Sequence, residues 1–530
     1  MTLKIAVAGK AKSAVEANID QLVADKVASR IAAKDFTLWG KDAEAESSIR
    51  LGWVTSATDS QALVESIIAL RDEFSAKGVD RFVLCGMGGS SLAPEVITNT
   101  AGVELVVLDS TDADQIGHAL AGDLHRTAII VSSKSGSTVE TDSQKRTFEK
   151  AFTDAGIDKT DRVVIVTDPG SPMEAAAKAD GYRIFNADAT VGGRYSALTA
   201  FGLVPSGLAG VDIQGLLNEA NAVAELLAAD DVTNPGLILG SVLARTASAS
   251  GYRDKVGIVT DGTSIVGFGD WAEQLIAEST GKLGKGVLPV VIDKNSPELG
   301  FSDVVIARLV ADATSASGDE VSVSGPLGAQ FLLWEYATVV ASRLIGINPF
   351  DQPDVESAKI AARAMLEQRD AEVEPTFVDG DIEVRSLELS LDGVTDTGAA
   401  VAKLLSELAE DGYVSIHAYL DRVDSPEAAE LRELFAKKSG RPVTFGWGPR
   451  FLHSTGQYHK GGPRQGVYLQ IVARAKNDIQ VPGRNFTFGE LIASQAAGDA
   501  NVLAKLGRPV LTLTLRDVTA GLKVIAASAR

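Results

Sequence analysis

The chain has 530 residues, too many for a single hydrophobic core, so three or four structural units are expected. Hydrophobic residues make up 45% and charged residues 23% of the sequence, which is typical of a folded globular protein. The net charge of −20 argues against nucleic acid or an anionic membrane as a partner, so a phosphorylated substrate would need a local positive site.

The sequence contains no run of about 18 apolar residues and begins with no signal-peptide pattern, which predicts a cytoplasmic protein. Cys85 is the single cysteine, so a disulfide within the chain and a metal cluster of thiolates are excluded. Because Cys85 lies in an apolar run, we expect a buried thiol.

Residues 1–78 carry apolar positions at helical spacing and are predicted to form a helical segment. From 79 to 205, short apolar runs alternate with helical patterns, which predicts βαβ units in a parallel sheet covered on both faces. The expected strands are 82–85, 105–108, 128–131, 163–166 and 182–185. Ligands of such sheets bind beyond the carboxyl ends of the strands.

A cluster of hydroxyl side chains follows the expected strand at 128–131. Five hydroxyls and one ammonium lie where a helix N-terminus would present free N–H groups, an arrangement that favours a phosphate. The residues are Ser132, Ser133, Lys134, Ser135, Ser137 and Thr138. An ordinary serine-rich cap is the alternative, although it would use only one or two of these hydroxyls. Ser137 and Glu140 have the spacing of a capping box, which predicts where the helix begins.

Two glycine-containing loops fall at the same edge of the predicted sheet. The loop 86–91 allows a ligand to approach the backbone, but it lacks the third glycine of a dinucleotide site, which disfavours a nicotinamide dehydrogenase. Gly192, Gly193 and Arg194 together offer a guanidinium and N–H groups to an anion or a developing oxyanion. An arginine in a surface turn is the alternative at this position.

Residues 206–250 are predicted to form a helical connector, and 251–372 a second α/β module. Its expected strands are 256–259, 287–292 and 304–306. A helix is predicted to begin at a pair with capping-box spacing, Asp270 and Glu273, and to end near Gly281.

Gln274 and Glu278 are four residues apart on this predicted helix and therefore share a face. Glu278 lies near the C-terminal end, where the helix dipole disfavours its charged form, so it is a credible proton-transfer base. From the residues alone, a solvent-facing glutamate is the favoured alternative.

The turn at 348–353 leads into another predicted helix, on which Gln352 and Lys359 are seven residues apart and point roughly the same way. Acidic residues at 370–385 predict a linker. The pattern predicts a C-terminal α/β unit over 373–530, which begins within this linker. Its glycine-rich loop contains His453 and His459 and suggests chemistry or anion binding. The other histidines are expected to be structural; they are His118, His125 and His417.

Five segments resemble, in order and approximate spacing, motifs of the phosphoglucose isomerase family. They are Gly86–Ser90, Ser133–Thr138, Gly192–Ser196, Gln274–Ser279 and Asp351–Lys359. The resemblance extends over about residues 50–370, and the whole chain most resembles the isomerase half of transaldolase/phosphoglucose isomerase fusion proteins.

This resemblance implies an α/β fold with two sugar-isomerase (SIS) domains, whose parallel sheets form three-layer αβα sandwiches, beside the N-terminal helices and the C-terminal unit. It implies reversible conversion of glucose 6-phosphate to fructose 6-phosphate through a cis-enediol, in glycolysis and gluconeogenesis, without a cofactor or metal. Isomerisation of mannose 6-phosphate is an alternative, as is a non-catalytic regulator that binds sugar phosphates.

By position, Glu278 matches the family's base, Arg194 the group that steadies the enediolate, and Lys359 the lysine that assists ring opening. A carboxylate, a cation and a phosphate anchor are what enediol chemistry requires, so this set disfavours the regulator. The resemblance implies substrate binding by Gly89, Ser90, Ser133, Lys134, Ser135, Thr138, Gly193, Gln274 and Gln352.

The ring-opening histidine is displaced in this sequence. In most of the family it lies between the Glu helix and the Asp-Gln motif, an interval that contains no histidine here. The similar segment 453–457 comes after Lys359 instead. In the ordinary family this histidine comes from the neighbouring subunit, so we hypothesise that here the C-terminal unit delivers His453 within one chain. The protein is expected to be a monomer or a homodimer.

Overall fold

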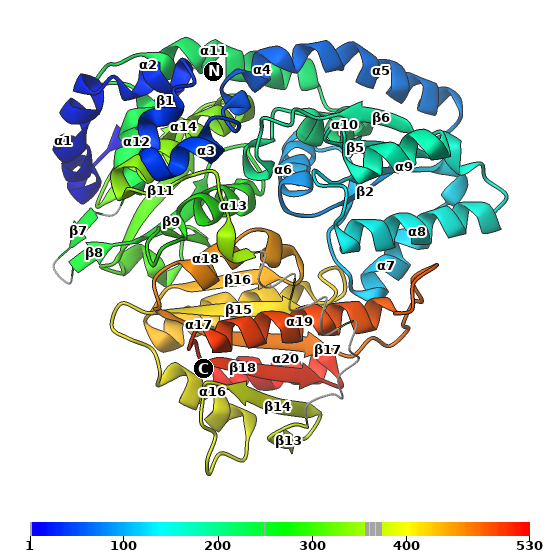
Figure 1. Ribbon diagram of the computed structural model, residues 1–530. Coiled ribbons are helices and arrows are strands. Elements are labelled where there is room, and N and C mark those ends of the chain that lie inside the picture. The colour runs from blue at the N-terminus through cyan, green and yellow to red at the C-terminus, as the bar shows by residue number, and fades with distance from the viewer. Residues whose placement is uncertain (1–2, 245, 249–250, 356–359, 361–365, 367–373) are drawn as a thin grey trace.

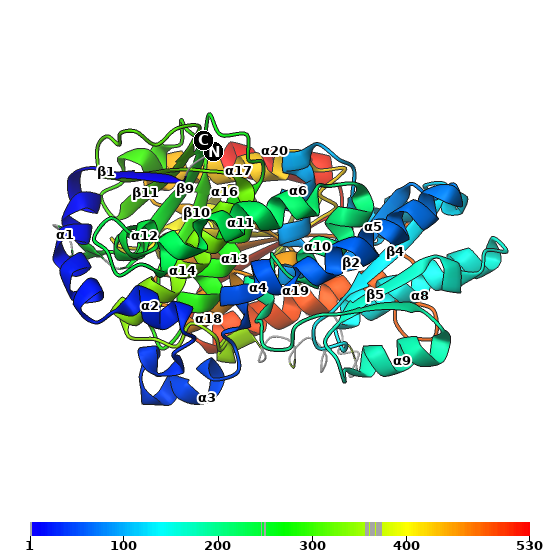
Figure 2. The same ribbon diagram turned by 90° about the horizontal axis from the view of Figure 1, so that it is seen from above.

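The computed structural model describes residues 3–244, 246–248, 251–355, 360, 366 and 374–530. It contains three main sheets, each rich in parallel pairs and flanked by helices (Figure 1). Seen from above, the first and second sheets lie side by side (Figure 2), and in Figure 1 the C-terminal unit lies beneath both.

The first sheet is parallel throughout, with the strand order β3-β2-β4-β5-β6. All five strands predicted in this region are present: β2 (Arg81–Gly86), β3 (Val106–Leu108), β4 (Thr127–Ser132), β5 (Val163–Thr167) and β6 (Arg183–Asn186). The flanking helices are α5 (Gln61–Ala76), α6 (Leu92–Ala101), α7 (Ala113–Leu120), α8 (Val139–Asp154), α9 (Pro172–Asp180) and α10 (Ala200–Ala209).

Alternate residues of these strands face opposite helical layers. Leu84 and Ile130 pack with α5, α6 and α10, whereas Cys85 and Val131 pack with α7, α8 and α9. The strands are therefore continuous apolar runs because both faces of the sheet are buried. The thiol of Cys85 is fully buried, as expected.

The second sheet has the order β1-β12-β11-β9-β10. Its parallel strands are β9 (Lys255–Asp261), β10 (Leu288–Ile292), β11 (Val304–Val310) and β12 (Glu320–Ser324). The expectation of an entirely helical N-terminal segment is wrong, because β1 (Lys4–Val7) pairs antiparallel with β12 at the edge. The accompanying helices are α1 (Gly9–Ala24), α2 (Val27–Ala32), α3 (Glu44–Ser47), α4 (Ser56–Asp59), α11 (Ile213–Ala228), α12 (Pro235–Leu243), α13 (Phe268–Thr280) and α14 (Leu327–Ile345). A small hairpin, β7 (Thr246–Ser248) and β8 (Gly251–Arg253), follows α12.

The third sheet forms the C-terminal unit, in the order β13-β14-β18-β17-β15-β16. Its strands are β13 (Phe377–Asp379), β14 (Ile382–Leu387), β15 (Tyr413–Tyr419), β16 (Val443–Trp447), β17 (Gly466–Ala473) and β18 (Val510–Leu515). Its helices are α16 (Thr397–Leu405), α17 (Leu431–Ser439), α18 (Gly456–Gly461), α19 (Phe488–Lys505) and α20 (Val518–Ser528).

The prediction of a linker at 370–385 is wrong over much of its length, because β13 and part of β14 lie within it. The side chain of Glu383 in β14 is 4% exposed and pairs with Arg385, Arg474 and Arg516. Three arginines thus neutralise an acidic residue that in the sequence resembles part of a solvated segment.

The C-terminal unit packs on both of the preceding modules. Val259 and Val290 of the second sheet share an apolar cluster with Tyr413 and Tyr458, while Phe488 joins the cluster of the first sheet. Buried apolar contacts therefore fix the C-terminal unit against both the first and the second module. Among the described helices, none combines the length and apolarity needed to cross a lipid bilayer.

Candidate active site

The predicted phosphate loop connects β4 to α8. Its hydroxyls are held by contacts within the loop: Ser133 Oγ lies 3.0 Å from Thr138 Oγ1, and Ser135 Oγ lies 3.1 Å from Ser137 Oγ. Thr138 is the N-cap of α8 but makes no side-chain capping hydrogen bond. The first turn of α8 can therefore direct its N–H groups at an anion.

Lys134 does not point a free charge into this loop. Its Nζ atom lies 2.5 Å from Asp168 Oδ2, and both side chains are largely buried. Burial raises the pKa of Asp168, an effect that the neighbouring Lys134 ammonium opposes. Lys134 thus links the phosphate loop to Asp168, the residue that follows β5.

Helix α13 positions Glu278 and Gln274. It begins at Phe268, after Gly267 at φ 74°, so the predicted start at a capping box of Asp270 and Glu273 is wrong. The left-handed conformation of Gly267 begins the helix earlier than the polar pattern indicates. Glu278 and Gln274 are 8% and 3% exposed, and Glu278 Oε2 lies 3.3 Å from Gln274 Nε2.

Arg194 is buried beside this pair rather than exposed in a surface turn. It lies in the short helix η7 (Gly193–Tyr195), is 3% exposed, and places NH1 3.6 Å from Glu278 Oε2. Its guanidinium also donates to Ser279 Oγ at 3.0 Å and to Gln352 Oε1 at 2.8 Å. These bonds fix its orientation, as a group that stabilises a developing oxyanion requires.

Lys282 is a member of this site that sequence reasoning missed. Its Nζ atom donates to Asn348 O at 2.7 Å and to Asp351 O at 2.6 Å, and pairs with Asp351 Oδ1 at 2.8 Å. Burial, with the Arg194 charge nearby, lowers the pKa of Lys282 to about 8. Lys282 and Arg194 both bind the turn that carries Gln352.

Glycines allow the loops to meet closely at this site. A Cβ atom on Gly88, at φ 56°, would lie 2.6 Å from the carbonyl oxygen of His453 and 2.9 Å from Gln274 Nε2. A Cβ atom on Gly89 would collide with the carbonyl of Gly193. The loop with Gly88, Gly89 and the buried Ser90 thus packs directly against η7 and the His453 loop.

His453 enters the site from the same chain, at the end of the short helix η10 (Arg450–His453). Its carbonyl accepts a 2.7 Å hydrogen bond from Gln274 Nε2, and its own Nε2 atom lies 2.9 Å from Glu140 Oε1. Gln495 Nε2 donates to the same Glu140 oxygen at 2.7 Å. The predicted Ser137–Glu140 capping box is wrong, because the Glu140 side chain turns to these partners instead.

Glu140 is the second residue that sequence reasoning missed as a site residue. It belongs to the first turn of α8, directly after the phosphate loop, so it joins that loop to His453. From His453, contacts continue through Gln274 to Glu278 and Arg194. The structure therefore brings most of the predicted residues to one location.

His459 lies apart from this group, and Lys359 lies outside the described residues. His459 is 1% exposed in the core of the C-terminal unit, where burial holds its pKa well below the usual value.

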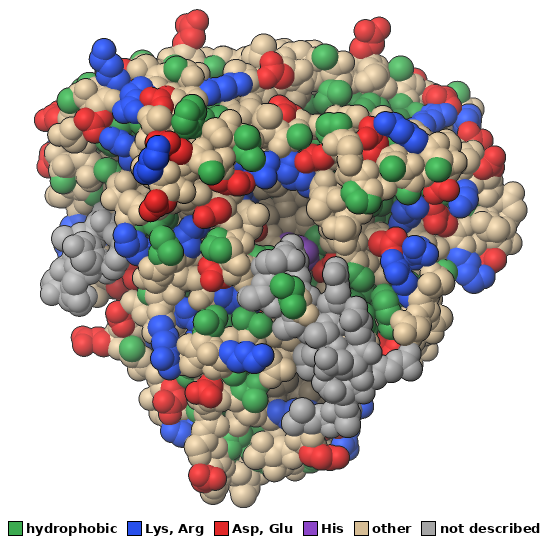
Figure 3. All heavy atoms as spheres, viewed as in Figure 1, with side chains coloured by type: hydrophobic (Ala, Val, Ile, Leu, Met, Phe, Trp, Pro, Cys, Tyr) green, Lys and Arg blue, Asp and Glu red, His purple; other side chains and the backbone are tan. Residues whose placement is uncertain are grey.

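The space-filling view shows a hollow in one face of the molecule, with a histidine side chain visible in it (Figure 3).

Comparison with solved structures supports the fold. A hypothetical protein of Thermus thermophilus aligns over 69% of this chain and all of its own, with a TM-score of 0.57 at 23% identity. A glucose-6-phosphate isomerase of Chlamydia trachomatis aligns over 62% of this chain and 75% of its own, with a TM-score of 0.50 at 19% identity. The predicted α/β architecture with sheets rich in parallel pairs is thus confirmed.

Comparison of sequences identifies the family. The model of the family "Phosphoglucose isomerase" matches residues 56–302. A "Probable glucose-6-phosphate isomerase" of Natronomonas pharaonis is 30% identical over 375 residues, which is 60% of this chain and 85% of that protein. One of the same name from Haloarcula marismortui is 29% identical over 365 residues, 58% of this chain and 82% of that protein. The chain belongs to the phosphoglucose isomerase family.

Proposed function

We propose that this protein catalyses the reversible isomerisation of D-glucose 6-phosphate to D-fructose 6-phosphate. The observation that carries the proposal is the Glu278 carboxylate, held 3.6 Å from the guanidinium of Arg194 and joined by contacts to the phosphate loop. Family membership and the names of the sequence relatives support the same reaction.

In this mechanism the phosphate group binds at the N-terminus of α8, with Ser133, Ser135 and Thr138 as hydroxyl donors. Anchoring the phosphate holds the sugar carbons in reach of the second module and converts a bimolecular encounter into an oriented reaction. Lys134 contributes through its support of the loop, because its charge is paired with Asp168.

The chemical step is a proton transfer between neighbouring carbons. Glu278 removes the proton from C2 of the open-chain aldose, which gives a cis-enediolate with the negative charge on O1. The same carboxyl then delivers a proton to C1 while the O2 hydroxyl proton passes to O1. Arg194 stabilises the negative charge that develops on the substrate oxygen, while Gln274 and Gln352 bind the sugar hydroxyls. No external oxidant or reductant is needed, because the aldehyde and the alcohol exchange places within one molecule.

Ring opening is assigned to His453 of the same chain. The contacts of its carbonyl with Gln274 and of its imidazole with Glu140 support this role, since both partners belong to the isomerase modules. The contact with Glu140 Oε1 fixes the orientation of the imidazole for proton transfer. Lys359 remains a proposed assistant on the basis of the resemblance alone. Because His453 contacts Gln274 and Glu140 of its own chain, we propose an active monomer. We also propose a cytoplasmic location.

A coupled spectrophotometric assay tests the proposal. Purified protein is given glucose 6-phosphate or mannose 6-phosphate, and fructose 6-phosphate formation is followed, with Glu278→Gln in parallel. The proposal expects turnover of glucose 6-phosphate and a large loss in the variant. Turnover of mannose 6-phosphate alone would reassign the substrate, and turnover of neither sugar would overturn the proposal.

A further inference from the structure

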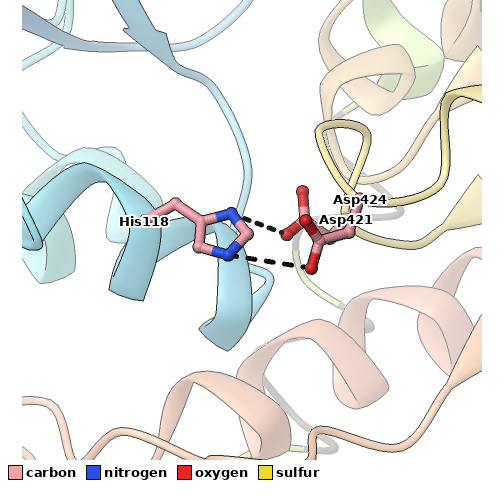
Figure 4. Close-up of side chains that lie close together, drawn as sticks. All are labelled: His118, Asp421 and Asp424. Atoms are coloured by element: carbon pink, nitrogen blue, oxygen red, sulfur yellow. Dashed lines mark ion pairs between the residues drawn. The ribbon is translucent and has the colours of Figure 1, made fainter.

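A cluster of three side chains lies where the first module meets the C-terminal unit, apart from the residues described above. His118 comes from the last turn of α7, whereas Asp421 and Asp424 come from the loop after β15. The imidazole Nδ1 lies 3.3 Å from Asp421 Oδ2, and Nε2 lies 3.7 Å from Asp424 Oδ2. Figure 4 shows the two carboxylates converging on the ring from the facing loop.

Asp421 is the unusual member of this cluster, because it is 8% exposed. Its Oδ1 atom accepts the Val423 N–H at 2.8 Å, but its buried Oδ2 atom has no hydrogen-bond donor in the described part of the chain. A buried carboxylate oxygen without a donor is costly. This oxygen faces His118 across the module boundary and marks a place for a cation.

The nearest basic side chain along the chain does not neutralise these carboxylates. Arg422 instead pairs with Glu95 at 2.8 Å and Asp109 at 3.5 Å, and donates to the carbonyl of Val107. Within the described residues, neither Asp421 nor Asp424 forms an ion pair with a lysine or arginine. The C-terminal end of α7, which carries His118, adds the negative end of a helix dipole.

We propose that His118, Asp421 and Asp424 bind a divalent transition-metal ion, with Zn²⁺ as the reference ion. Each residue offers one ligand atom, and the three atoms lie within 4.8 Å of one another. Tetrahedral zinc bound at about 2.0–2.2 Å from imidazole nitrogen and carboxylate oxygen holds its ligand atoms about 3.4 Å apart, so the three side chains must move closer together when the ion binds. His118 and Asp424 are 45% and 65% exposed, so small rotations of their side chains can close the site.

One imidazole with two carboxylates is a donor set that suits zinc, and water would complete the coordination. The ion would join α7 of the first module to the loop after β15. Since the C-terminal unit also carries His453, the metal would strengthen the attachment of the unit that supplies this residue. The role is structural, and it does not depend on the proposed isomerase reaction.

The test uses the full-length protein after removal of metals with a chelator and dialysis. Zn²⁺ binding is measured by isothermal titration calorimetry for the wild type and for His118→Gln and Asp424→Asn. Both substituted side chains are well exposed, so the fold should be kept. His125→Gln is the matched control, because His125 is an exposed histidine of the same module outside the cluster.

The proposal expects one zinc site in the wild type and in His125→Gln, with a Kd raised at least tenfold in His118→Gln and Asp424→Asn. Zinc should also raise the thermal unfolding midpoint of the first two proteins and not of the other two, because a ligand of the native state stabilises it. Equal zinc affinity in all four proteins would overturn the proposal. So would a wild-type thermal unfolding midpoint that does not respond to zinc.

Discussion

The Nε2 atom of His453 lies 2.9 Å from Oε1 of Glu140, which joins the C-terminal unit to the helix that follows the phosphate loop. Because Gln495 donates to the same oxygen at 2.7 Å, the carboxylate is held in one orientation before any substrate binds. The imidazole is thereby directed by a fixed negative charge.

This pair predicts that Glu140→Gln lowers kcat about 10- to 100-fold while KM changes little. The neutral amide makes a weaker hydrogen bond with the imidazole than the carboxylate does, so the ring is held less firmly for proton transfer. Asp154→Asn, an exposed position at the end of the same helix, is the control. Steady-state kinetics across pH 6–9 provide the measurement. A raised KM with an unchanged kcat would assign Glu140 to binding instead.

Delivery of His453 within one chain predicts a specific complementation result. Glu278→Gln and His453→Ala each disable one group, and a mixture allowed to exchange subunits should stay inactive. If the histidine came from a neighbouring subunit, hybrid dimers would regain up to about a quarter of wild-type activity. Recovery of that size would contradict the geometry of His453, Gln274 and Glu140.

The phosphate loop predicts that Thr138→Val lowers kcat/KM at least tenfold, mainly through KM. Valine keeps the shape but removes one hydrogen bond to a charged group, worth about 1.5–3 kcal/mol. Inhibition by inorganic phosphate should weaken in parallel. Ser66→Ala, an exposed serine of α5, serves as the control. A loss confined to kcat would speak against phosphate binding at this loop.

The lowered pKa of Lys282, about 8, predicts an alkaline limb in the activity profile. Below that pH the ammonium is charged and holds the turn that presents Gln352; above it, the ion pair with Asp351 is lost and kcat/KM should fall. Lys282→Arg keeps the charge to higher pH and should move this limb upward. Lys285→Arg, at an exposed site, should leave it in place. Measurements of kcat/KM from pH 7 to 10 test whether the alkaline limb moves in Lys282→Arg and stays in place in Lys285→Arg.

Two buried histidines predict acid sensitivity of the C-terminal unit. Burial lowers the pKa of His417 and of His459 below the usual 6.5. Below pH 6.5 the unfolded chain therefore binds protons that the native state does not bind. The stabilising contribution is complete above pH 6.5 and is lost as pH falls below it, by up to about 1.4 kcal/mol per pH unit for each histidine. Denaturant unfolding between pH 5 and 7.5 measures this slope. His459→Gln should reduce it, and an unchanged slope would contradict the assignment.

Much of the fold follows from apolar runs, because strands buried on both faces are nearly continuous in hydrophobicity. The first sheet was therefore predictable strand by strand. β12 was not, since its sequence EVSVS alternates polar and apolar residues, and neither was its partner β1, which pairs with it from the far end of the sequence. The acidic strand β14 was missed because the arginines that neutralise Glu383 are distant in sequence.

The functional site also contains some residues that sequence motifs identify and others that only the folded chain reveals. The resemblance of their motifs to a known family identified Glu278, Gln274 and Arg194, whereas spacing alone favoured a solvent-facing Glu278. Glu140 has the spacing of a capping residue, and only the folded chain supplies His453 as its competing partner. Lys282 carries no motif, so its hold on the turn before Gln352 depends on packing that local sequence does not reveal.

The central claim is that Glu278 moves a proton between the sugar carbons. The most direct test is deuterium incorporation into fructose 6-phosphate during incubation in D₂O, followed by NMR at C1, for the wild type, Glu278→Gln and Glu273→Gln. Glu273 is on the same helix but lines, with Asp270 and Trp447, a cavity of about 370 Å³ that Glu278 does not line, so it is a matched control. We predict exchange by the wild type and by Glu273→Gln, and a reduction of about 10²- to 10⁴-fold in Glu278→Gln with phosphate inhibition retained. Exchange by Glu278→Gln at the wild-type rate would contradict the account.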